Sequence, residues 1–404
     1  MVSLNMVLAQ ERLDVAIKKR SNLFNWRGQF TPEFVEYILQ TFTKPGDKIL
    51  DPFSGSGTVL QESAKLELMA TGFEINPSAY AMSKFFTFCN MPFAERHIFH
   101  EAFEAKLKSQ LLNLNGQKVY IDKLDYRESY SNLLNFGIRF NDLIQDKQER
   151  IFLLNILFQS ERDKTLTVKD SIYKSFLFTK KALFSLPYSE QSINAHLKDA
   201  KSVGCELEGE IDFLLTSPPY INVFNYHQNY RAIIETFKFD ILKVAHSEFG
   251  SNRKNRGNRF KTVIQYCIDM EIALNSFWKA LKQNGKMVLV LGRESNVRGI
   301  PFYNGQLIIE ILEKSCGFSN IRTLERKFTN KFGISIKEDI IIAEKISHSI
   351  LNFNHGKSIA LKHLENSLTK SKDEITFDII DAIKTIDLIQ PSPLFNPTNI
   401  LVND

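Results

Sequence analysis

Cysteine is scarce and scattered in this sequence. The chain has four cysteines among its 404 residues, with no Cys-x-x-Cys pair and no histidine at the spacing of a metal ligand. This pattern excludes a disulfide framework and a zinc site. It predicts a protein of the reducing cytoplasm that carries no metal.

Long apolar runs are also missing. No stretch approaches the roughly 18 apolar residues of a membrane span. The densest apolar stretch, 151–158, is interrupted by Asn155 and is predicted to be a buried helix. Near the start of the chain Glu11, Arg12 and Asp14 stand where a secretion signal would be apolar. We therefore expect no membrane partner.

Charge of one sign is not strongly in excess. The formal net charge of +5 permits a polyanionic partner such as nucleic acid without requiring one. The hydrophobic fraction of 43% is that of a globular protein, and 33 phenylalanines predict extensive aromatic packing in the core. Because ordinary domains have about 100–200 residues, one large core with an insertion, or two domains, is expected.

Strands and helices alternate in the first part of the chain. Lys48–Asp51 is a predicted strand, 58–66 a helix and 70–74 a second strand, and a further helix starts at Pro77. Before them, Thr31 and Pro32 have the form of a helix start, and that helix is predicted over 34–42. This alternation predicts an α/β fold with a parallel sheet that binds ligands at the carboxyl ends of its strands.

The alternation stops near Met91 and resumes after Ala195. The intervening segment predicts amphipathic helices over 101–112, 148–158 and 172–183. After it, strands are predicted over 211–216, 286–292, 323–328 and 336–345, and helical regions over 227–244, 270–282 and 305–316. The predicted parts are a first catalytic part (1–90), an inserted helical subdomain (91–195), a second catalytic part (196–346) and a C-terminal extension (347–404).

The first stretch with chemical content is Asp51-Pro-Phe-Ser-Gly-Ser-Gly-Thr58, between a strand and a helix. Its two glycines permit positive φ and a close approach of a ligand to the backbone. Glu74, at the end of the next strand, is placed to accept hydrogen bonds from ribose hydroxyls. No Gly-Lys-Ser/Thr ending follows, and Leu60 stands where a dinucleotide loop needs a third glycine. An adenosine cofactor smaller than a dinucleotide is therefore predicted.

The second stretch is Thr216-Ser-Pro-Pro-Tyr220, again at the end of a strand. Consecutive prolines fix the backbone and remove two N–H donors, so the Ser217 hydroxyl and the Pro218 carbonyl are held as acceptors, which suits an amino group. Tyr220 offers an aromatic face for a planar base, and Phe224 and Tyr226 are expected to extend that wall.

These motifs resemble the S-adenosylmethionine-dependent amino-methyltransferases that act on exocyclic nitrogens of DNA bases. The resemblance covers about 1–90 and 195–345 and includes Gly28-Gln-Phe-Thr-Pro-Glu33 and Gly72-Phe-Glu-Ile-Asn76. It implies a Rossmann-like class I fold with a mostly parallel seven-stranded sheet and S-adenosylmethionine as cofactor. The implied cofactor residues are Phe30, Thr31, Asp51, Phe53, Gly55, Gly57, Thr58, Glu74, Ile75 and Asp199, and the implied catalytic residues are Ser217, Pro218, Pro219 and Tyr220.

The base that is methylated follows from the first residue of the catalytic motif. Within the family, Ser-Pro-Pro-Tyr is typical of cytosine-N4 enzymes and Asp- or Asn-Pro-Pro-Tyr of adenine-N6 enzymes. Ser217 therefore favours cytosine N4, in a base flipped out of the duplex. Adenine N6, RNA or a protein glutamine remain alternative acceptors, and a catalytically silent DNA-binding protein is the alternative outside enzymes. The absence of the Pro-Cys motif argues against a carbon-5 cytosine enzyme.

The resemblance implies double-stranded DNA as partner and a place in a restriction-modification system beside a separately encoded restriction endonuclease. The insertion resembles a target-recognition region. A basic stretch over 251–261 is predicted to be a flexible loop that contacts phosphates. Its basic residues are Arg253, Lys254, Arg256, Arg259 and Lys261.

Overall fold

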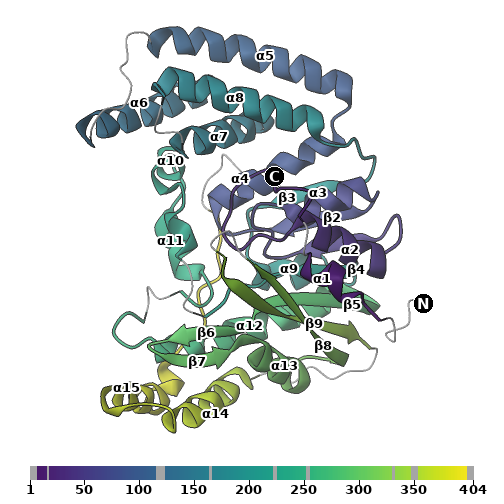
Figure 1. Cartoon of the computed structure of the whole chain (residues 1–404), viewed down its shortest axis with the longest axis vertical. Coiled ribbons are helices and arrows are strands. Elements are labelled where there is room, and N and C mark those ends of the chain that lie inside the picture. Colours follow the sequence, from purple (N-terminus) through teal and green to yellow (C-terminus); the bar gives the residue numbers. More distant parts are fainter. Residues whose placement is uncertain are drawn as a thin grey trace.

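The computed structural model describes residues 7–15, 18–114, 123–162, 166–221, 225–251, 255–329, 333–346 and 354–397. Its centre is a seven-stranded sheet with the strand order β3-β2-β1-β4-β5-β9-β8 (Figure 1). The strands of the sheet are β1 (Lys48–Asp51), β2 (Met69–Phe73), β3 (Ile193–His196), β4 (Ile211–Thr216), β5 (Leu281–Gly292), β8 (Phe318–Thr329) and β9 (Ser335–Lys345).

Parallel pairing runs from β3 to β5, and β9 joins β5 and β8 in antiparallel fashion. The strand order reverses between β1 and β4, so the carboxyl ends of these two neighbouring strands flank the point at which α/β sheets bind ligands. Asp51 and Thr216 are the last residues of β1 and β4. The predicted α/β class with a mostly parallel seven-stranded sheet is confirmed.

Helices cover both faces of the sheet because neighbouring apolar residues of each strand point to opposite sides. Leu215, Val288 and Ile342 belong to a core shared with α2 (Pro32–Phe42), α3 (Thr58–Lys65) and α4 (Pro77–Lys84). Their neighbours Leu214, Met287 and Ile341 pack with α12 (Phe260–Ala280) and α13 (Asn304–Ser315). The shorter helices around the sheet are α1 (Gln10–Asp14), α9 (Val203–Glu206), α10 (Arg231–Thr236) and α11 (Ile241–Ser247).

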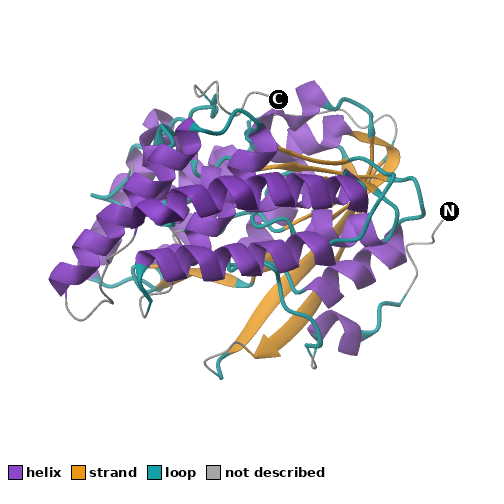
Figure 2. Cartoon of the chain, turned by 90° about the horizontal axis from the view of Figure 1, so that it is seen from above, coloured by secondary structure: helices purple, strands orange, loops and turns teal. Residues whose placement is uncertain are grey.

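The predicted insertion contains four long helices that lie together beside one edge of the sheet (Figures 1 and 2). They are α5 (Phe93–Leu111), α6 (Lys123–Asp142), α7 (Lys147–Arg162) and α8 (Val168–Ser185). Much of the aromatic excess is packed here, for example Phe103 against Phe152 with ring centroids 4.8 Å apart. The predicted helices over 101–112, 148–158 and 172–183 fall in α5, α7 and α8, with 112 just beyond the end of α5. The role of this segment in target recognition remains a prediction.

The sequence did not reveal β3, whose last residue lies just beyond the predicted end of the insertion at 195. Ile193–His196 has only two buried apolar residues, Ile193 and Ala195, in alternation with half-buried Asn194 and His196. This edge strand therefore lacks an apolar run such as 213–215 in β4 or 287–291 in β5, which marks those strands as central.

Two predicted helices have different bounds in the structure. The region 227–244 is a short 3-10 turn followed by α10 and α11, because Lys238 takes a left-handed conformation between them and Asp240 caps α11 with its carboxylate. The helix predicted from Met270 begins ten residues earlier, at Phe260. The predicted flexible stretch therefore ends before Lys261, which lies in the first turn of α12.

The C-terminal extension adds α14 (Gly356–Leu368) and α15 (Asp373–Lys384), which lie near the short hairpin β6 (Glu294–Val297) and β7 (Ile300–Tyr303) (Figure 1). The chain then returns to the body, where the backbone and the hydroxyl of Ser392 donate to Asp269. Within the described ranges no helix is long and apolar enough to cross a bilayer, and no cluster of acidic, histidine and cysteine side chains could hold a metal.

Candidate active site

The two motif stretches meet through a direct hydrogen bond. The Thr216 hydroxyl donates to Asp51 Oδ1 over 2.6 Å, although the residues are 165 positions apart. The backbone N–H of Phe53 also donates to that oxygen, over 3.3 Å. Burial raises the pKa of Asp51 to about 7, against the effect of these donors. The carboxyl group is thus fixed in place at the boundary between β1 and β4.

Glu74 orders the loop that follows β1. Its two carboxylate oxygens accept from the backbone N–H groups of Gly55 (2.9 Å) and Asn76 (2.8 Å). Burial raises the pKa of Glu74 to about 7 as well. Each oxygen has a second lone pair, so this carboxylate can also accept from the hydroxyl groups of a ligand.

Gly57 has the positive φ that the sequence predicts, and it also makes a close packing contact. It has a φ of 87°, and a Cβ at this position would stand 2.7 Å from the ring of Phe86 and 2.8 Å from Ser83 Cα. The glycine therefore allows the loop to pack against the chain beyond α4. Gly57 does not line the cavity beside the loop, whereas Gly55 does.

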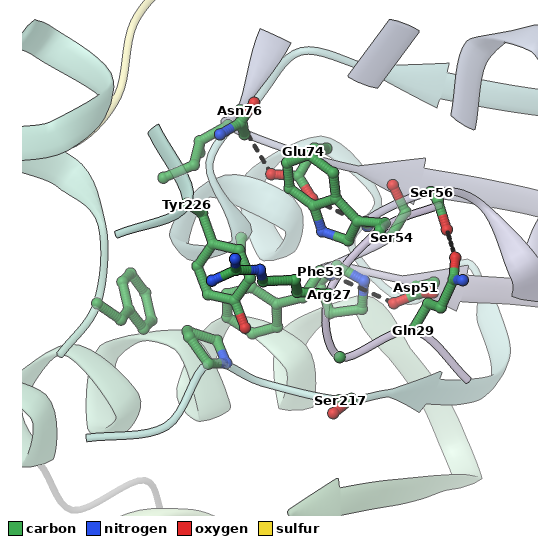
Figure 3. A pocket seen from close by; sticks show the side chains of 18 of the residues that line it. Arg27, Gln29, Asp51, Phe53, Ser54, Ser56, Glu74, Asn76, Ser217 and Tyr226 are labelled. Atoms are coloured by element: carbon green, nitrogen blue, oxygen red, sulfur yellow. Dashed lines mark hydrogen bonds between the residues drawn. The ribbon is translucent and has the colours of Figure 1, made fainter. Parts of the chain in front are cut away.

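A cavity of about 900 Å³, including the space at its mouth, opens beside this loop, and we call it the inner pocket. Figure 3 shows Glu74 and Asn76 toward one end of the view and Ser217 toward the other. Predicted cofactor residues that line the inner pocket are Phe30, Asp51, Phe53, Gly55, Thr58, Glu74, Ile75 and Asp199. Thr31 does not line it and is the N-cap residue of α2.

Much of the inner pocket's wall consists of contacts that the sequence motifs do not indicate. Trp26 and Tyr226 stack on each other across that wall, with centroids 6.0 Å apart and ring planes at 20°. Gln29 accepts from the Ser56 hydroxyl over 2.7 Å, which ties the segment before α2 to the glycine loop (Figure 3). Glu248 lines the pocket too, held by His227, whose backbone N–H and Nδ1 each lie 2.7 Å from a carboxylate oxygen.

This lining suits an adenosine cofactor that carries positive charge. Trp26 and Tyr226 supply flat apolar surface for a base. Asp51, Glu74 and Glu248 supply acceptors for hydroxyl groups and a negative environment for cationic groups. These acceptors and aromatic rings therefore fit S-adenosylmethionine, which has an adenine ring, ribose hydroxyls, a sulfonium and an ammonium group.

Asp199 lines the inner pocket, but the chain itself already occupies its carboxylate. One oxygen accepts from Lys201 N and the other from Phe395 N, each over 2.9 Å, and Lys201 Nζ stands 3.6 Å away. Burial raises the pKa of this carboxyl group, and only 1% of the residue is exposed. Asp199 therefore holds the returning C-terminal segment in place. Its predicted contact with the cofactor adenine stays a prediction.

The Ser217-Pro-Pro-Tyr220 turn follows β4 directly, and the structure holds its tyrosine from two sides. A Cβ at Gly292, at the end of β5, would stand 2.9 Å from the Tyr220 ring, and one at Gly250 would stand 2.7 Å from the Tyr220 carbonyl oxygen. The Ser217 and Tyr220 hydroxyl oxygens lie 3.4 Å apart. Burial raises the pKa of Tyr220 above its usual value, so the phenol stays protonated.

A second cavity lies on the other side of this turn, and we call it the outer chamber. It encloses about 2340 Å³ including open solvent, and both Tyr220 and Thr31 line it. Residues 27–30 and Ser217 line the inner pocket and the outer chamber alike. Ser217 therefore stands where the two cavities adjoin. Tyr226, expected to extend the Tyr220 wall, lines the inner pocket instead.

The residues predicted to contact DNA do not all lie in one flexible loop. Arg253, Lys254 and Phe224 lie outside the described residues. Arg256 is exposed in a turn, and Arg259 is the exposed N-cap residue of α12. Lys261 pairs with Asp381 of α15 over 2.9 Å, so a phosphate would have to compete with this carboxylate.

The glycine loop, the acid after β2 and the proline turn after β4 lie at the carboxyl ends of strands of one Rossmann-like sheet. Residues 7–85 match the N6/N4 methyltransferase family model, which is described as DNA methylase. The match covers the segment before α2, the glycine loop and Glu74. Over this segment the chain is similar to the N6/N4 DNA methylases.

Two type II methyltransferases are among its curated relatives. M.MjaII of Methanocaldococcus jannaschii is 24% identical over 200 residues, which are 48% of this chain and 31% of that protein. M.BsoBI of Geobacillus stearothermophilus is 22% identical over 278 residues, 56% of this chain and 55% of that protein. The chain thus spans only about a third to a half of the length of these relatives.

The solved structures that align with this chain share little sequence with it. A methyltransferase described as S-adenosylmethionine-dependent, from Methanosarcina mazei, aligns with 76% of this chain and 97% of its own, at 11% identity and a TM-score of 0.32. A putative sarcosine dimethylglycine methyltransferase from Galdieria sulphuraria aligns with 89% of this chain and 81% of its own, at 10% identity and a TM-score of 0.29.

Proposed function

We propose that this protein is a site-specific DNA methyltransferase that transfers the methyl group of S-adenosylmethionine to the exocyclic N4 of a flipped-out cytosine, as part of a restriction-modification system. The observation that carries the proposal is the boundary between the two cavities. The lining of the inner pocket suits a cationic adenosine ligand. Ser217 lines both this pocket and the outer chamber. A methyl group that passes from a cofactor in the inner pocket to a base in the outer chamber would cross at this boundary.

The chain's contribution to cofactor binding begins with its carboxylates. Glu74 accepts from ribose hydroxyls, and Asp51 and Glu248 provide negative charge for the cationic part of the ligand. The cofactor, when bound, supplies an electrophilic methyl group on a positively charged sulfur. Trp26 and Tyr226 exclude water from the wall between Glu74 and Ser217, which strengthens electrostatic interactions inside the pocket.

The proline turn positions the amino group of the base. Ser217 Oγ and the Pro218 carbonyl oxygen accept hydrogen bonds from the two amino hydrogens, which directs the nitrogen lone pair toward the inner pocket. Pro219 lines the inner pocket, and its ring fixes the backbone there. Tyr220, held by Gly292 and protonated, provides the wall on which the base stacks. Orientation of the reactants supplies most of the acceleration in this scheme.

Base flipping is required because the amino nitrogen of a stacked base cannot reach a cofactor buried in the inner pocket. The outer chamber is open to solvent and adjoins the inner pocket at Ser217, so a flipped-out nucleotide can enter it from the surface. Lys18, Arg27 and Lys337 line it and supply the positive charge that DNA phosphates require. We accordingly propose double-stranded DNA as the partner. A separately encoded restriction endonuclease is the further partner that the type II relatives suggest.

The choice of cytosine N4 rests on Ser217, because a neutral hydroxyl at this position resembles the cytosine type. Adenine N6 is the second candidate, supported by the family match, which includes enzymes for both bases. Both reactions use the same two cavities, so the product has to be identified chemically.

Transfer of a radiolabelled methyl group from S-adenosylmethionine to duplex DNA by the purified full chain tests the proposal. We expect Ser217→Ala and Tyr220→Ala to lower kcat by about 10²-fold or more, the effect of losing an orienting group, with little change in cofactor affinity. Tyr188→Ala, an exposed tyrosine that lines neither cavity, is the matched control and is expected to keep full activity. Wild-type rates in both motif variants would refute the assignment. DNA binding by the wild type without transfer would favour the silent binding protein.

A further inference from the structure

A row of three residues crosses the sheet beneath Tyr220. Gly292 of β5 pairs directly with Glu338 of β9, and Glu338 pairs directly with Arg326 of β8. Side chains of directly paired residues in antiparallel strands point to the same face of a sheet. Because a Cβ on Gly292 would meet the Tyr220 ring, Tyr220 lies on the face to which Glu338 and Arg326 point. The side chains of Tyr220, Glu338 and Arg326 all line the outer chamber.

Arg326 is buried in an unusual state. Only 2% of the residue is exposed, and its guanidinium lies over the rings of Phe34 and Phe328, 4.1 and 4.9 Å from their centroids. Its Nε is 3.5 Å from Glu338 Oε2 and makes no hydrogen bond. No hydrogen bond to the Nη atoms is found among the residues that the structure describes. A buried cation without hydrogen bonds is costly, which indicates that its donors serve a bound molecule.

The neighbouring Arg293 differs from Arg326, because carboxylates of the same strands, β8 and β9, pair with it closely. Arg293 follows β5 and also lines the outer chamber. Its Nη2 makes no hydrogen bond either, but it lies at ion-pair distance from two carboxylates, 3.0 Å from Asp339 and 2.6 Å from Glu325. Its Nε donates to Asp339 over 3.1 Å. Two close carboxylates therefore neutralise Arg293, whereas Arg326 has Glu338 alone, at 3.5 Å.

We propose that Arg326, oriented by Glu338, binds the ring N3 and the O2 of the target cytosine and thereby selects cytosine over adenine. This inference rests on the proposed function and names the residue that determines its base specificity. A guanidinium presents a planar fork of donors, and cytosine presents two adjacent acceptors, N3 and O2, beside its amino group. Adenine has N1 beside its amino group but a C–H next to N1, so one arm of the fork would remain unpaired.

The test compares two target bases in variants of the full chain. The duplex contains the sequence that sequencing of methylated positions identifies as the recognition site, with either cytosine or 3-deazacytosine as target. The analogue keeps the N4 amino group and O2 but replaces the N3 acceptor by a C–H. Variants are Arg326→Gln, Arg326→Lys, which keeps the charge without the fork, and the positioning variant Glu338→Gln. Lys327→Gln, on the exposed side of the same strand, is the matched control.

For cytosine we expect Arg326→Gln and Arg326→Lys to lower kcat/KM by about 10- to 100-fold, the discrimination typical of a bidentate contact. On 3-deazacytosine the wild type should lose a similar factor, and both variants should lose little more, because the contact is already broken. Glu338→Gln should show the same pattern to a smaller degree, and Lys327→Gln should match the wild type.

Equal losses on both bases would mean that Arg326 contacts phosphate or only supports the wall, and would overturn the inference. Unchanged kcat/KM in both Arg326 variants would do the same, as would wild-type transfer to adenine alone. Absence of transfer by the wild type to any DNA base would instead refute the proposed function. Equal melting temperatures and cofactor affinities identify the variants that fold, and Glu338→Gln provides the test if neither Arg326 variant does.

Discussion

Replacing Gly292 by alanine should impair methyl transfer without affecting cofactor binding. The residue has ordinary strand geometry, so alanine adds no backbone strain, but its Cβ would stand 2.9, 3.3 and 3.4 Å from three atoms of the Tyr220 ring. Ordinary contacts begin near 3.4 Å, so the ring must move by about half an ångström. Since a misplacement of 1 Å can reduce a rate about 10²-fold, a reduction of roughly tenfold in kcat is expected.

Single-turnover transfer to DNA, together with cofactor binding by calorimetry, measures both parts of this expectation. Tyr220→Ala provides the internal control, because Gly292→Ala should have almost no further effect once the ring is gone. A decrease of similar size in both backgrounds would show that Gly292 acts on something other than Tyr220. Full activity of the single variant would show that the position of the ring does not matter, which would refute the proposed role of Tyr220.

Two further predictions concern the inner pocket. Because burial raises the pKa of Asp51 and Glu74 to about 7 in the ligand-free protein, affinity for S-adenosylmethionine should rise with pH from 6 to 8, by about tenfold for each carboxyl group that must ionise. The stability of the ligand-free fold should fall as pH rises from about 4 to 7, because the unfolded chain loses these protons at lower pH than the native protein does. An affinity that does not change with pH in calorimetry, or a melting temperature that does not change with pH, would contradict these two expectations. Thr216→Val removes the 2.6 Å hydrogen bond to Asp51, so it should raise the pKa of Asp51 further, move the affinity profile to higher pH and cost about 1–3 kcal/mol of unfolding free energy in chemical denaturation at pH 8.

The sequence predicted those elements whose own residues form a recognisable pattern. Strands β4 and β5 contain the apolar runs 213–215 and 287–291, and the glycine loop and Glu74 stand at fixed offsets from β1. Short β3 gave no such signal, because only Ile193 and Ala195 of that edge strand are buried. The start of α12 was missed because basic residues before and within its first turn resemble a solvated loop, whereas Lys261 is paired with Asp381, which is distant in sequence.

The candidate site was predictable where one motif contains the contact and not where folding brings separate segments together. Nothing near Asp199 in the sequence indicates that Phe395 donates to its carboxylate. Glu248 reaches the inner pocket through its contact with His227, and no motif marks either residue. The row from Gly292 through Glu338 to Arg326 depends on strand register, which only the assembled sheet defines.

The central claim is the transfer of a methyl group to cytosine N4 at the boundary marked by Ser217. Mass spectrometry of nucleosides from the DNA of cells that express the chain, beside cells that express Tyr220→Ala, tests it most directly. The account predicts N4-methylcytosine with the wild-type chain and none above background with the variant. N6-methyladenine as the only new nucleoside, or equal amounts of N4-methylcytosine in both cultures, would contradict it.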